Sequence, residues 1–432
     1  MRHPHRTKDE DSKLPFTVPT ITKPFADYKW RWMEFTPVES FNRIDILLGV
    51  ARAIQDVEGE LASSNAFNAR LQKVQTDLLP TGSPSLTSTN TDRNLIRRQG
   101  RYWRGLDILA PVGAGEGHGM TLTPMGRSFA NGSVSPDDFV RHAIATHRLP
   151  NPSIDTAKRV QEWHGAGLSM RPLSIIVSVL TALAAQAGPN AAYLTNEQLH
   201  RVLVPLSIVN KDPDFLAEAV LAFRQDKSPF ALLPNCAPGA NDRRMLREHL
   251  LFLHYGDVLT LEDVGENYRD RFRLRETDAA IAVEAIQGLH EASLDERENA
   301  VADAIVTVQR NRRSVEVLDR PSQAKFRRDV LGACDSKCLI TGETLQDVLI
   351  ACHIHEVKDG GSDHVSNGIT LRADLHILFD SQKLRIGDEG QVTLAPDIAE
   401  FPSYSALPAN IELPEHLNKA ALRIRYEYGI VS

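Results

Sequence analysis

The chain has 432 residues, of which 42% are hydrophobic and 24% are charged. At roughly 100–200 residues per domain, this length predicts two to four domains, and the composition excludes collagen-like, wholly disordered and membrane-embedded proteins. The formal net charge is −7, so a nucleic-acid partner would have to be bound by local basic patches. Four cysteines are too few for a disulfide framework, which predicts a cytoplasmic protein.

Residues 1–27 carry charges and prolines without hydrophobic periodicity, and we predict a flexible arm there. This start contains no apolar segment of the kind that a secretory signal requires. The longest apolar stretch, from Leu173 to Ala187, is shorter than the roughly 20 residues that span a bilayer. We therefore expect a buried helix at this stretch and no membrane partner.

Residues 28–134 have the order of elements expected of a winged-helix-like DNA-binding domain. Apolar residues recur at helical spacing from Ile44 to Ile54. Further along, the pattern predicts a basic helix ending near Gly105, a strand at 108–112, a glycine-rich turn at 113–119 and a strand at 120–122. Helix, strand, turn and strand in this order are typical of a winged helix with its β wing.

Arginines gather in the predicted basic helix and again before the last domain. Arg97, Arg101 and Arg104 fall on one helical face, and few acidic residues flank them, so we predict contacts with DNA phosphates. For the second cluster, a solvated helix face and a DNA contact are both open. The candidate nucleic-acid-binding residues are Arg97, Arg98, Arg101, Arg104, Arg327 and Arg328.

Residues 135–318 predict a helical domain and connector, so the first two thirds of this multidomain chain are expected to be mostly α. Thr195 and Gln198 have the spacing of a capping box, in which each side chain bonds the backbone of the other residue at a helix start. The composition changes near Pro321, and we place the last domain at 319–432.

Short strands, glycine turns and a group of His and Cys residues mark this last domain, which we expect to be α+β. The pattern predicts a helix at 323–331, a strand from Cys338 to Thr341, a second strand at 348–354, a polar loop at 358–366, a helix with His376 and Asp380, and a hairpin with its turn at 387–390. His353 lies near the end of the second strand, and Asn367 follows the loop.

Three spaced motifs in this domain resemble the HNH endonucleases, which have a ββα-metal core. They are the CxxTG pattern from Cys338 to Gly342, the AxHI pattern from Ala351 to Ile354, and NGxxLxxxxHxLFD from Asn367 to Asp380. The resemblance implies that His353 is the catalytic base, that Asn367 fixes the loop and that His376 binds the metal. Two N-terminal phrases, YWRGLDIL and LTPMGRSFANG, also resemble DNA-reading segments of some restriction-type nucleases.

The chemistry of phosphodiester hydrolysis requires these residue types. An imidazole titrates near neutral pH and can activate water, and a cation neutralises charge on the phosphate. His376 and Asp380 stand four residues apart and share a helix face, so they can hold one divalent metal. Carboxylate and water ligands favour Mg²⁺ or Mn²⁺, whereas imidazole also suits Zn²⁺ or Ni²⁺.

Cys352 stands where many relatives have Asp, Glu or His. It is a third candidate metal ligand as a thiolate, or else a small residue that fills the core. Cys334 and Cys338 have no second cysteine pair downstream, so we expect both to pack in the core rather than to bind zinc.

The sequence thus predicts a metal-dependent DNA endonuclease, set in a restriction or anti-phage defence system. Because one HNH site cuts one strand at a time, a homodimer is compatible with a double-strand break. Two alternatives stay open: a non-catalytic DNA-binding regulator with a degenerate HNH scaffold, and an HNH nuclease toxin that acts on RNA or host DNA.

Overall fold

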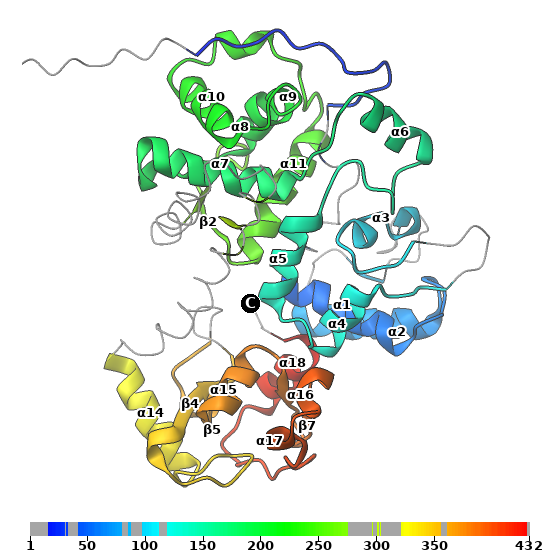
Figure 1. Ribbon diagram of the computed structural model, residues 1–432. Helices are drawn as coiled ribbons and strands as arrows, with labels where there is room; N and C mark the ends of the chain where they lie inside the picture. The colour runs from blue at the N-terminus through cyan, green and yellow to red at the C-terminus, as the bar shows by residue number, and fades with distance from the viewer. Residues whose placement is uncertain are drawn as a thin grey trace, which may run out of the picture.

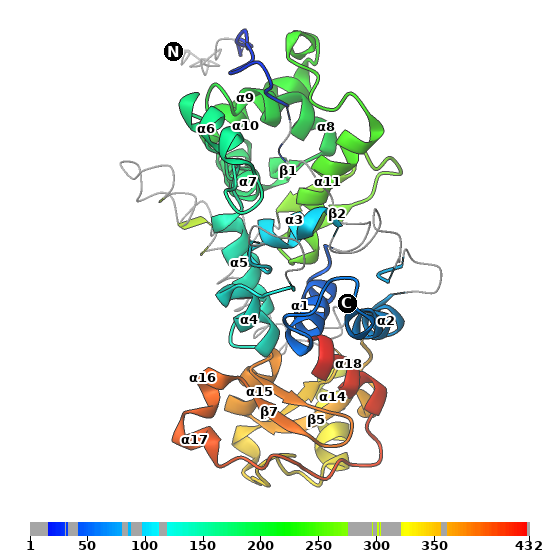
Figure 2. The ribbon, with the colours of Figure 1, turned by 90° about the vertical axis from the view of Figure 1, so that its right-hand side faces the viewer.

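The computed structural model describes residues 16–30, 32, 42–79, 85–87, 97–111, 119–274, 296, 300–301, 303, 321–355 and 361–429. These residues are mainly helical, and their strands form three small sheets, one of three strands and two of two strands. Figures 1 and 2 show a large helical part above a smaller C-terminal part that contains the two-stranded sheets.

The large part is built from helices joined by short connections. Its helices are α1 (Ile44–Asp56), α2 (Asn65–Leu78), α3 (Arg97–Gly105), α4 (Pro124–Asn131), α5 (Pro136–Thr146), α6 (Ala157–Gly165), α7 (Pro172–Ala187), α8 (Asn196–Gln198), α9 (Val204–Leu206), α10 (Pro213–Gln225) and α11 (Ala240–Tyr255). The helix expected near Ile44 is confirmed as α1, and the long apolar stretch is the buried helix α7. Among the described residues, none of the helices has the length and hydropathy of a membrane span.

The predicted capping box opens α8. The Thr195 hydroxyl accepts a hydrogen bond from the Gln198 backbone at 3.2 Å, and the Gln198 side chain accepts one from the Thr195 backbone at 3.1 Å. A π-helical turn at Leu199–Leu203 then joins α8 to α9, whose second residue is Pro205. Proline has no backbone N–H to continue the α-helical hydrogen-bond pattern.

One small sheet completes the large part. Its strands are β1 (Tyr193–Leu194), β2 (Leu259–Glu262) and β3 (Arg271–Leu274), with β3 between the other two and antiparallel to both. A single core cluster of buried side chains runs from Tyr28 to Val301 and also includes Tyr428, so it contains both of the N-terminal regions that the sequence divided near 134. The domain boundaries themselves stay predictions.

The winged helix is not confirmed. The basic helix is present as α3, but the two expected strands are reduced to an isolated bridge between Leu109 and Leu122. Residues 112–118, with most of the glycine run, lie outside the described residues. Residues 1–15 of the predicted arm also lie outside them, and Phe16 packs on the rings of Phe215 and Phe230.

The C-terminal part is an α+β unit with its own buried core. Its elements are α14 (Pro321–Ala333), β4 (Leu349–His353), β5 (Gly368–Arg372), α15 (Ala373–Asp380), β6 (Leu384–Ile386), β7 (Val392–Leu394), α16 (Pro396–Ala399), α17 (Pro402–Ser405) and α18 (Lys419–Tyr428). The helix α14 and the hairpin β6–β7 confirm the elements expected there. β4 and β5 are antiparallel, and His353 is opposite Gly368.

The order of two strands and a helix is confirmed, but the first predicted strand is wrong. Residues 338–341 form a turn, in which the Gly342 N–H bonds the Cys338 carbonyl at 2.9 Å. Gly342 completes this turn with a φ of +71°, a conformation that suits glycine. The second strand is instead β5, whose Ile369 and Leu371 are buried on one face.

The last helix joins the two parts. α18 contacts α1, and Figures 1 and 2 both show it beside α1 and α2. Asp77 at the end of α2 is the central acceptor: it accepts hydrogen bonds from Arg423 at 2.8 Å and from the Tyr428 hydroxyl at 2.6 Å. Arg52 of α1 donates to the Tyr426 carbonyl at 3.1 Å. These bonds connect residues more than 300 positions apart.

Candidate functional site

His353 is the last residue of β4, and two neighbours fix its ring. The Phe326 ring of α14 is stacked on the imidazole with centroids 3.9 Å apart and planes 1° from parallel. On the ring edge, Nε2 lies 3.0 Å from the Asp363 carboxylate. The His353 side chain is 16% exposed. A carboxylate partner of this kind selects the tautomer of a histidine and fixes the orientation of its ring.

Gly368 makes this stacking possible. A Cβ atom at Gly368 would lie 2.3 Å from Val330 Cγ2 and 2.8 Å from Phe326 Cζ. Because real Cβ atoms do not approach other carbons so closely, only glycine lets α14 pack against the end of the strand pair. The NG dipeptide of the motif therefore has a structural role beside that of Asn367.

Asn367 holds the two ends of the loop that follows His353. Its side-chain nitrogen donates to the carbonyls of His355 at 2.7 Å and Ser362 at 2.8 Å, and its side-chain oxygen accepts from the His355 N–H at 2.9 Å. Its backbone carbonyl accepts from the Ile354 N–H at 2.8 Å. The buried side chain thus uses donors and acceptor together, as an amide can and a carboxylate cannot.

His376 and Asp380 meet on one face of α15, as their spacing predicts. His376 Nε2 lies 2.8 Å from Asp380 Oδ2. The other carboxylate oxygen of Asp380 lies 3.3 Å from the guanidinium of Arg425, which comes from α18. Arg425 is 2% exposed and also donates to the carbonyls of Ile354 and Phe379, both at 3.0 Å. One guanidinium therefore connects the residue after His353 to the end of α15.

Cys352 lies in the apolar core rather than beside these polar groups. It is 1% exposed and belongs to the same buried cluster as Ile369 and Leu375. Burial, and then the charge of Asp380, raise the pKa of the thiol well above its ordinary value, so the neutral form is favoured. This environment agrees with the alternative in which Cys352 fills the core.

No group of three His, Cys, Asp or Glu side chains within the described ranges is arranged to hold a metal ion. The predicted set of Cys352, His376 and Asp380 is therefore not assembled, and the part that the structure brings together is the His376–Asp380 pair. Cys334 and Cys338 are buried in two different apolar clusters, and both are free thiols.

The predicted DNA-contacting arginines of α3 are bound to the protein's own backbone. Arg101 donates twice to the Ile154 carbonyl, at 2.6 and 3.2 Å. Arg104 is buried and donates to the Ser153 carbonyl at 3.2 Å. The expected open basic face is therefore wrong for these two residues, because the loop after α5 covers them. The side chains of Arg97 and Arg98 lie outside the described residues.

The two predicted arginines of α14 differ from each other. Arg327 donates to the Leu349 carbonyl at 2.9 Å, so it supports the start of β4. Arg328 has a side chain that is 75% exposed and lies 4.0 Å from Asp329. Both residues are exposed, so a phosphate could reach either of them.

A comparison with known families agrees with this geometry. Residues 338–386 match the HNH endonuclease family. The matched segment contains β4, β5 and α15 and every candidate catalytic residue, and it does not include the N-terminal segments that resemble restriction-type nucleases. No curated protein matches the chain. The match to an HNH nuclease domain implies a nucleic acid as substrate.

Three residues of this HNH site were missed from the sequence. Asp363 stands in the polar loop four residues before Asn367, and a carboxylate at this place in a loop between two motif residues was a usable signal. Phe326 and Arg425 come from helices outside the matched segment. Nothing local distinguishes either of them from other residues of an amphipathic helix.

Proposed function

We propose that this chain is an endonuclease that hydrolyses phosphodiester bonds of DNA, with His353 as the general base. The observation that carries the proposal is the fixed imidazole: its Nε2 bonds the Asp363 carboxylate, and its face rests on Phe326. A base with an orienting carboxylate is the arrangement that general-base catalysis needs. With the proton on Nε2, the basic lone pair of the neutral ring is on Nδ1.

In the proposed step, His353 takes a proton from water while the water oxygen attacks phosphorus. The bond from phosphorus to the leaving oxygen breaks, and the leaving alkoxide takes up a proton from solvent. Asn367 is a positioning residue in this scheme, because its bonds to His355 and Ser362 fix the loop that carries Asp363. The loop in turn fixes the tautomer of His353.

HNH nucleases generally use a divalent metal ion. His376 and Asp380 offer an imidazole nitrogen and a carboxylate on one helix face, which fits a cation that completes its shell with water and phosphate oxygens. When bound, such an ion supplies positive charge that neutralises the phosphate. Arg425 would keep Asp380 in place at the same time, because it bonds the second carboxylate oxygen.

A setting in restriction or anti-phage defence is part of the proposal and rests on the resemblance of the two N-terminal phrases. A double-strand break requires two HNH sites or two cutting events, so we expect a homodimer on DNA. The defence setting and the homodimer do not affect the proposed role of His353, and the first experiment tests that role.

The test incubates the full chain with plasmid DNA, phage DNA and RNA, each with Mg²⁺, Mn²⁺, Ni²⁺ or Zn²⁺ and with a chelator. We expect metal-dependent cutting of DNA, and a loss of roughly 10²–10⁴-fold in rate for His353→Ala. His164→Ala is the matched control, because His164 is an exposed histidine on α6.

Equal cutting by wild type and His353→Ala would refute the assignment of the base. Cutting of RNA alone would favour the toxin alternative, and no cutting of any substrate with DNA binding retained would favour the regulator. Circular dichroism of each variant verifies that the change of activity is not a loss of fold.

A further inference from the structure

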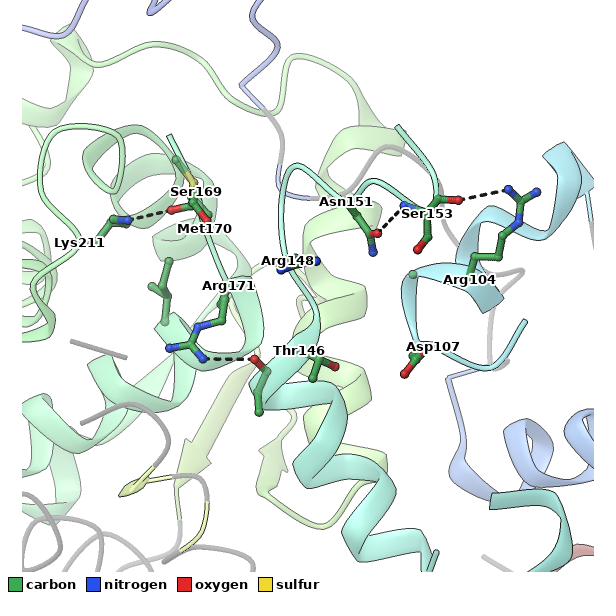
Figure 3. Close-up of a pocket in the computed structure, with 13 residues that line it drawn as sticks. Arg104, Asp107, Thr146, Arg148, Asn151, Ser153, Ser169, Met170, Arg171 and Lys211 are labelled. Carbon is green, nitrogen blue, oxygen red and sulfur yellow. Dashed lines mark hydrogen bonds between the residues drawn. The ribbon is translucent and has the colours of Figure 1, made fainter. Parts of the chain in front are cut away.

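A cavity in the helical part of the molecule contains none of the HNH-site residues and has no role in the chemistry above. It has a volume of about 470 Å³ and lies where the end of α3, the end of α5 and the start of α7 meet. Figure 3 shows its lining residues around the end of α5, with Lys211 and Arg171 on one side and Arg104 on the other. Four cationic residues line it: Arg104, Arg148, Arg171 and Lys211.

Backbone carbonyls hold two of these cations in place. Arg171 donates to the Ala145 carbonyl at 3.2 Å and so covers the negative end of α5. Lys211 donates to the Ser169 carbonyl at 2.8 Å. Both side chains are therefore fixed at the cavity wall. Long side chains held in this way lose less conformational entropy when they bind a ligand.

Arg104 is the buried member of the group. It is 8% exposed, and only Nη1 has a partner, the Ser153 carbonyl. Within the described part of the chain, Nε and Nη2 are buried without a hydrogen-bond partner. Burial, and then the charge of Arg101, lower the pKa of Arg104. A buried guanidinium with two unused donors is costly, and an anion in the cavity would satisfy both donors.

The charge balance of the lining favours an anion. Asp107 is the one acidic residue among the lining residues, and it lies 2.9 Å from His142 Nε2. Arg148 is exposed and forms no ion pair with any described residue. The N-terminus of α7, a helix of 16 residues, also borders the cavity, and its N-cap residue makes no side-chain capping bond. A helix N-terminus adds a partial positive charge.

We propose that this cavity is a phosphate-binding site for a nucleotide or for the backbone of a nucleic acid. The described lining contains no aromatic ring on which a base could stack, so we assign recognition to the phosphate group and not to the base. Arginine guanidinium groups bind phosphate through two parallel bonds, which suits the two unused donors of Arg104. Binding of a nucleic-acid backbone phosphate rests on the proposed function, whereas binding of a free nucleotide does not depend on it.

The experiment measures binding by calorimetry on the full-length His353→Ala protein with a chelator present, so that no probe is cut. The probes are inorganic phosphate, AMP, adenosine as the matched probe without phosphate, and a short DNA duplex at several salt concentrations. The test variant is Arg148→Ala, because this side chain is exposed and surface substitutions usually change stability by no more than about 0.5 kcal/mol. The matched control is Arg269→Ala, an arginine with 61% side-chain exposure outside the cavity.

Two results support the proposal and identify the source of the phosphate. In the first, AMP binds, adenosine does not, and Arg148→Ala weakens AMP binding by about tenfold or more while Arg269→Ala has no effect. In the second, only duplex binding is weakened by Arg148→Ala, and the salt dependence falls by about one phosphate contact.

Two other results overturn it. One is that Arg148→Ala and Arg269→Ala have the same effect on every probe, which would mean general surface electrostatics. The other is that Arg148→Ala has no effect on AMP, phosphate or duplex. The cutting assay with native His353 is independent of these measurements. The proposed nuclease activity can therefore be refuted while phosphate binding in the cavity is supported, and phosphate binding can be refuted while the activity is supported.

Discussion

The HNH domain and the helical part differ in how well the sequence indicates the role of an arginine. In the HNH domain, Arg425 comes from a helix without any motif, yet it bonds Asp380 and the carbonyl after His353. In the helical part, Arg101 and Arg104 form an obvious basic run, yet both bond carbonyls of the 153–154 loop. A dense charge run was thus a poor guide to an open nucleic-acid surface.

The difference has a physical cause. The motif residues of the HNH domain interact over short separations, so their spacing on a strand and a helix determines their geometry. The hydrogen-bond partners of an arginine depend instead on the tertiary structure, because its long side chain can reach acceptors that are distant in the sequence. Each prediction below changes one residue in one of the two parts and asks whether this contrast holds.

After His353→Ala, the largest effect is expected at Asn367. Asn367→Ala removes three side-chain hydrogen bonds and releases the loop that carries Asp363. We expect cleavage to fall by about 100-fold, because a base that is no longer positioned loses a rate factor of this order, while DNA binding changes less than about twofold. Single-turnover cleavage and a binding titration measure the two quantities.

The control for this variant is Asn235→Ala, which removes an asparagine that bonds a loop N–H in the helical part. A parallel loss of DNA binding and cleavage in Asn367→Ala would contradict a positioning role, because it would indicate a general loss of structure. A shift in the pH profile of the remaining activity would support it, because the tautomer of His353 would then be less well defined.

The next effect is on stability, at the contact between α14 and the strand pair. Gly368→Ala places a Cβ atom 2.3 Å from Val330 Cγ2, and we expect the free energy of unfolding to fall by about 3 kcal/mol. Gly332→Ala is the matched control on α14 itself: its Cβ would meet no atom within 4 Å, and we expect a gain of roughly 0.5–1 kcal/mol. Urea unfolding followed by circular dichroism measures both.

A Gly368→Ala protein as stable as the wild type would mean that α14 does not press on the strand pair as described. The stacked arrangement of Phe326 and His353 would then have no packing support. Cleavage by this variant would be expected to remain high in that case, which gives a second readout of the same contact.

The sequence predicted the HNH site well where a motif specified it. His353 on a strand end, Asn367 in the loop and the His376–Asp380 pair all lie where the spacing placed them, because strand and helix periodicities are local. The first strand was misplaced, since a CxxTG turn and a strand have similar apolar patterns over so short a stretch. The alternation in β5 was the better strand signal, with Ile369 and Leu371 buried.

In the helical part, the sequence predicted helices and a helix cap but not which charged side chains are buried. The buried helix α7 and the capping box at Thr195 follow from patterns that involve only neighbouring residues. The burial of Arg104 could not be predicted, because its partner Ser153 comes from a loop 49 residues away. Phe326 and Arg425 were missed in the HNH domain for the same reason, that long-range contacts leave no local pattern.

A smaller effect is expected at buried histidines of the helical part. Burial, with the charge of His147 added, lowers the pKa of His249 to about 3, so the folded state keeps this ring neutral. Stability from this group is complete above the ordinary pKa near 6.5 and is lost as the pH falls toward 3. At pH 5 the loss is about 2 kcal/mol, since the unfolded chain binds a proton that the folded chain excludes.

His249→Phe should therefore flatten the fall in stability between pH 7 and pH 5. The chain has four tryptophans, Trp30, Trp32, Trp103 and Trp163. Because all four lie in the helical part, tryptophan fluorescence reports on this part alone. Trp32 lies edge-on to His249 with ring centroids 6.3 Å apart, which makes it a direct probe. The control His164→Phe changes an exposed histidine and should leave the slope as it is. If the slope of stability against pH is unchanged in His249→Phe, His249 is not the group that causes the loss of stability.

The smallest effect is expected where the two parts meet. Burial raises the pKa of Asp77, but hydrogen bonds from Arg423 and Tyr428 outweigh it and hold the pKa below its ordinary value. Asp77→Asn keeps the shape and removes the charge, so we expect the C-terminal part to lose about 1 kcal/mol, or roughly 4 °C in Tm.

The measurement compares two probes of thermal unfolding in the same sample. Tryptophan fluorescence follows the helical part alone, whereas far-ultraviolet circular dichroism follows both parts, so docked parts that unfold together give coincident curves. We expect Asp77→Asn to separate the curves, and Asp56→Asn, whose carboxylate is 48% exposed and pairs with Arg70, to leave them coincident. Coincident curves in Asp77→Asn would mean that the remaining contacts, among them Arg52 with Tyr426 and Lys73 with Glu427, are sufficient to dock the two parts, so that the charge of Asp77 is not needed at their interface.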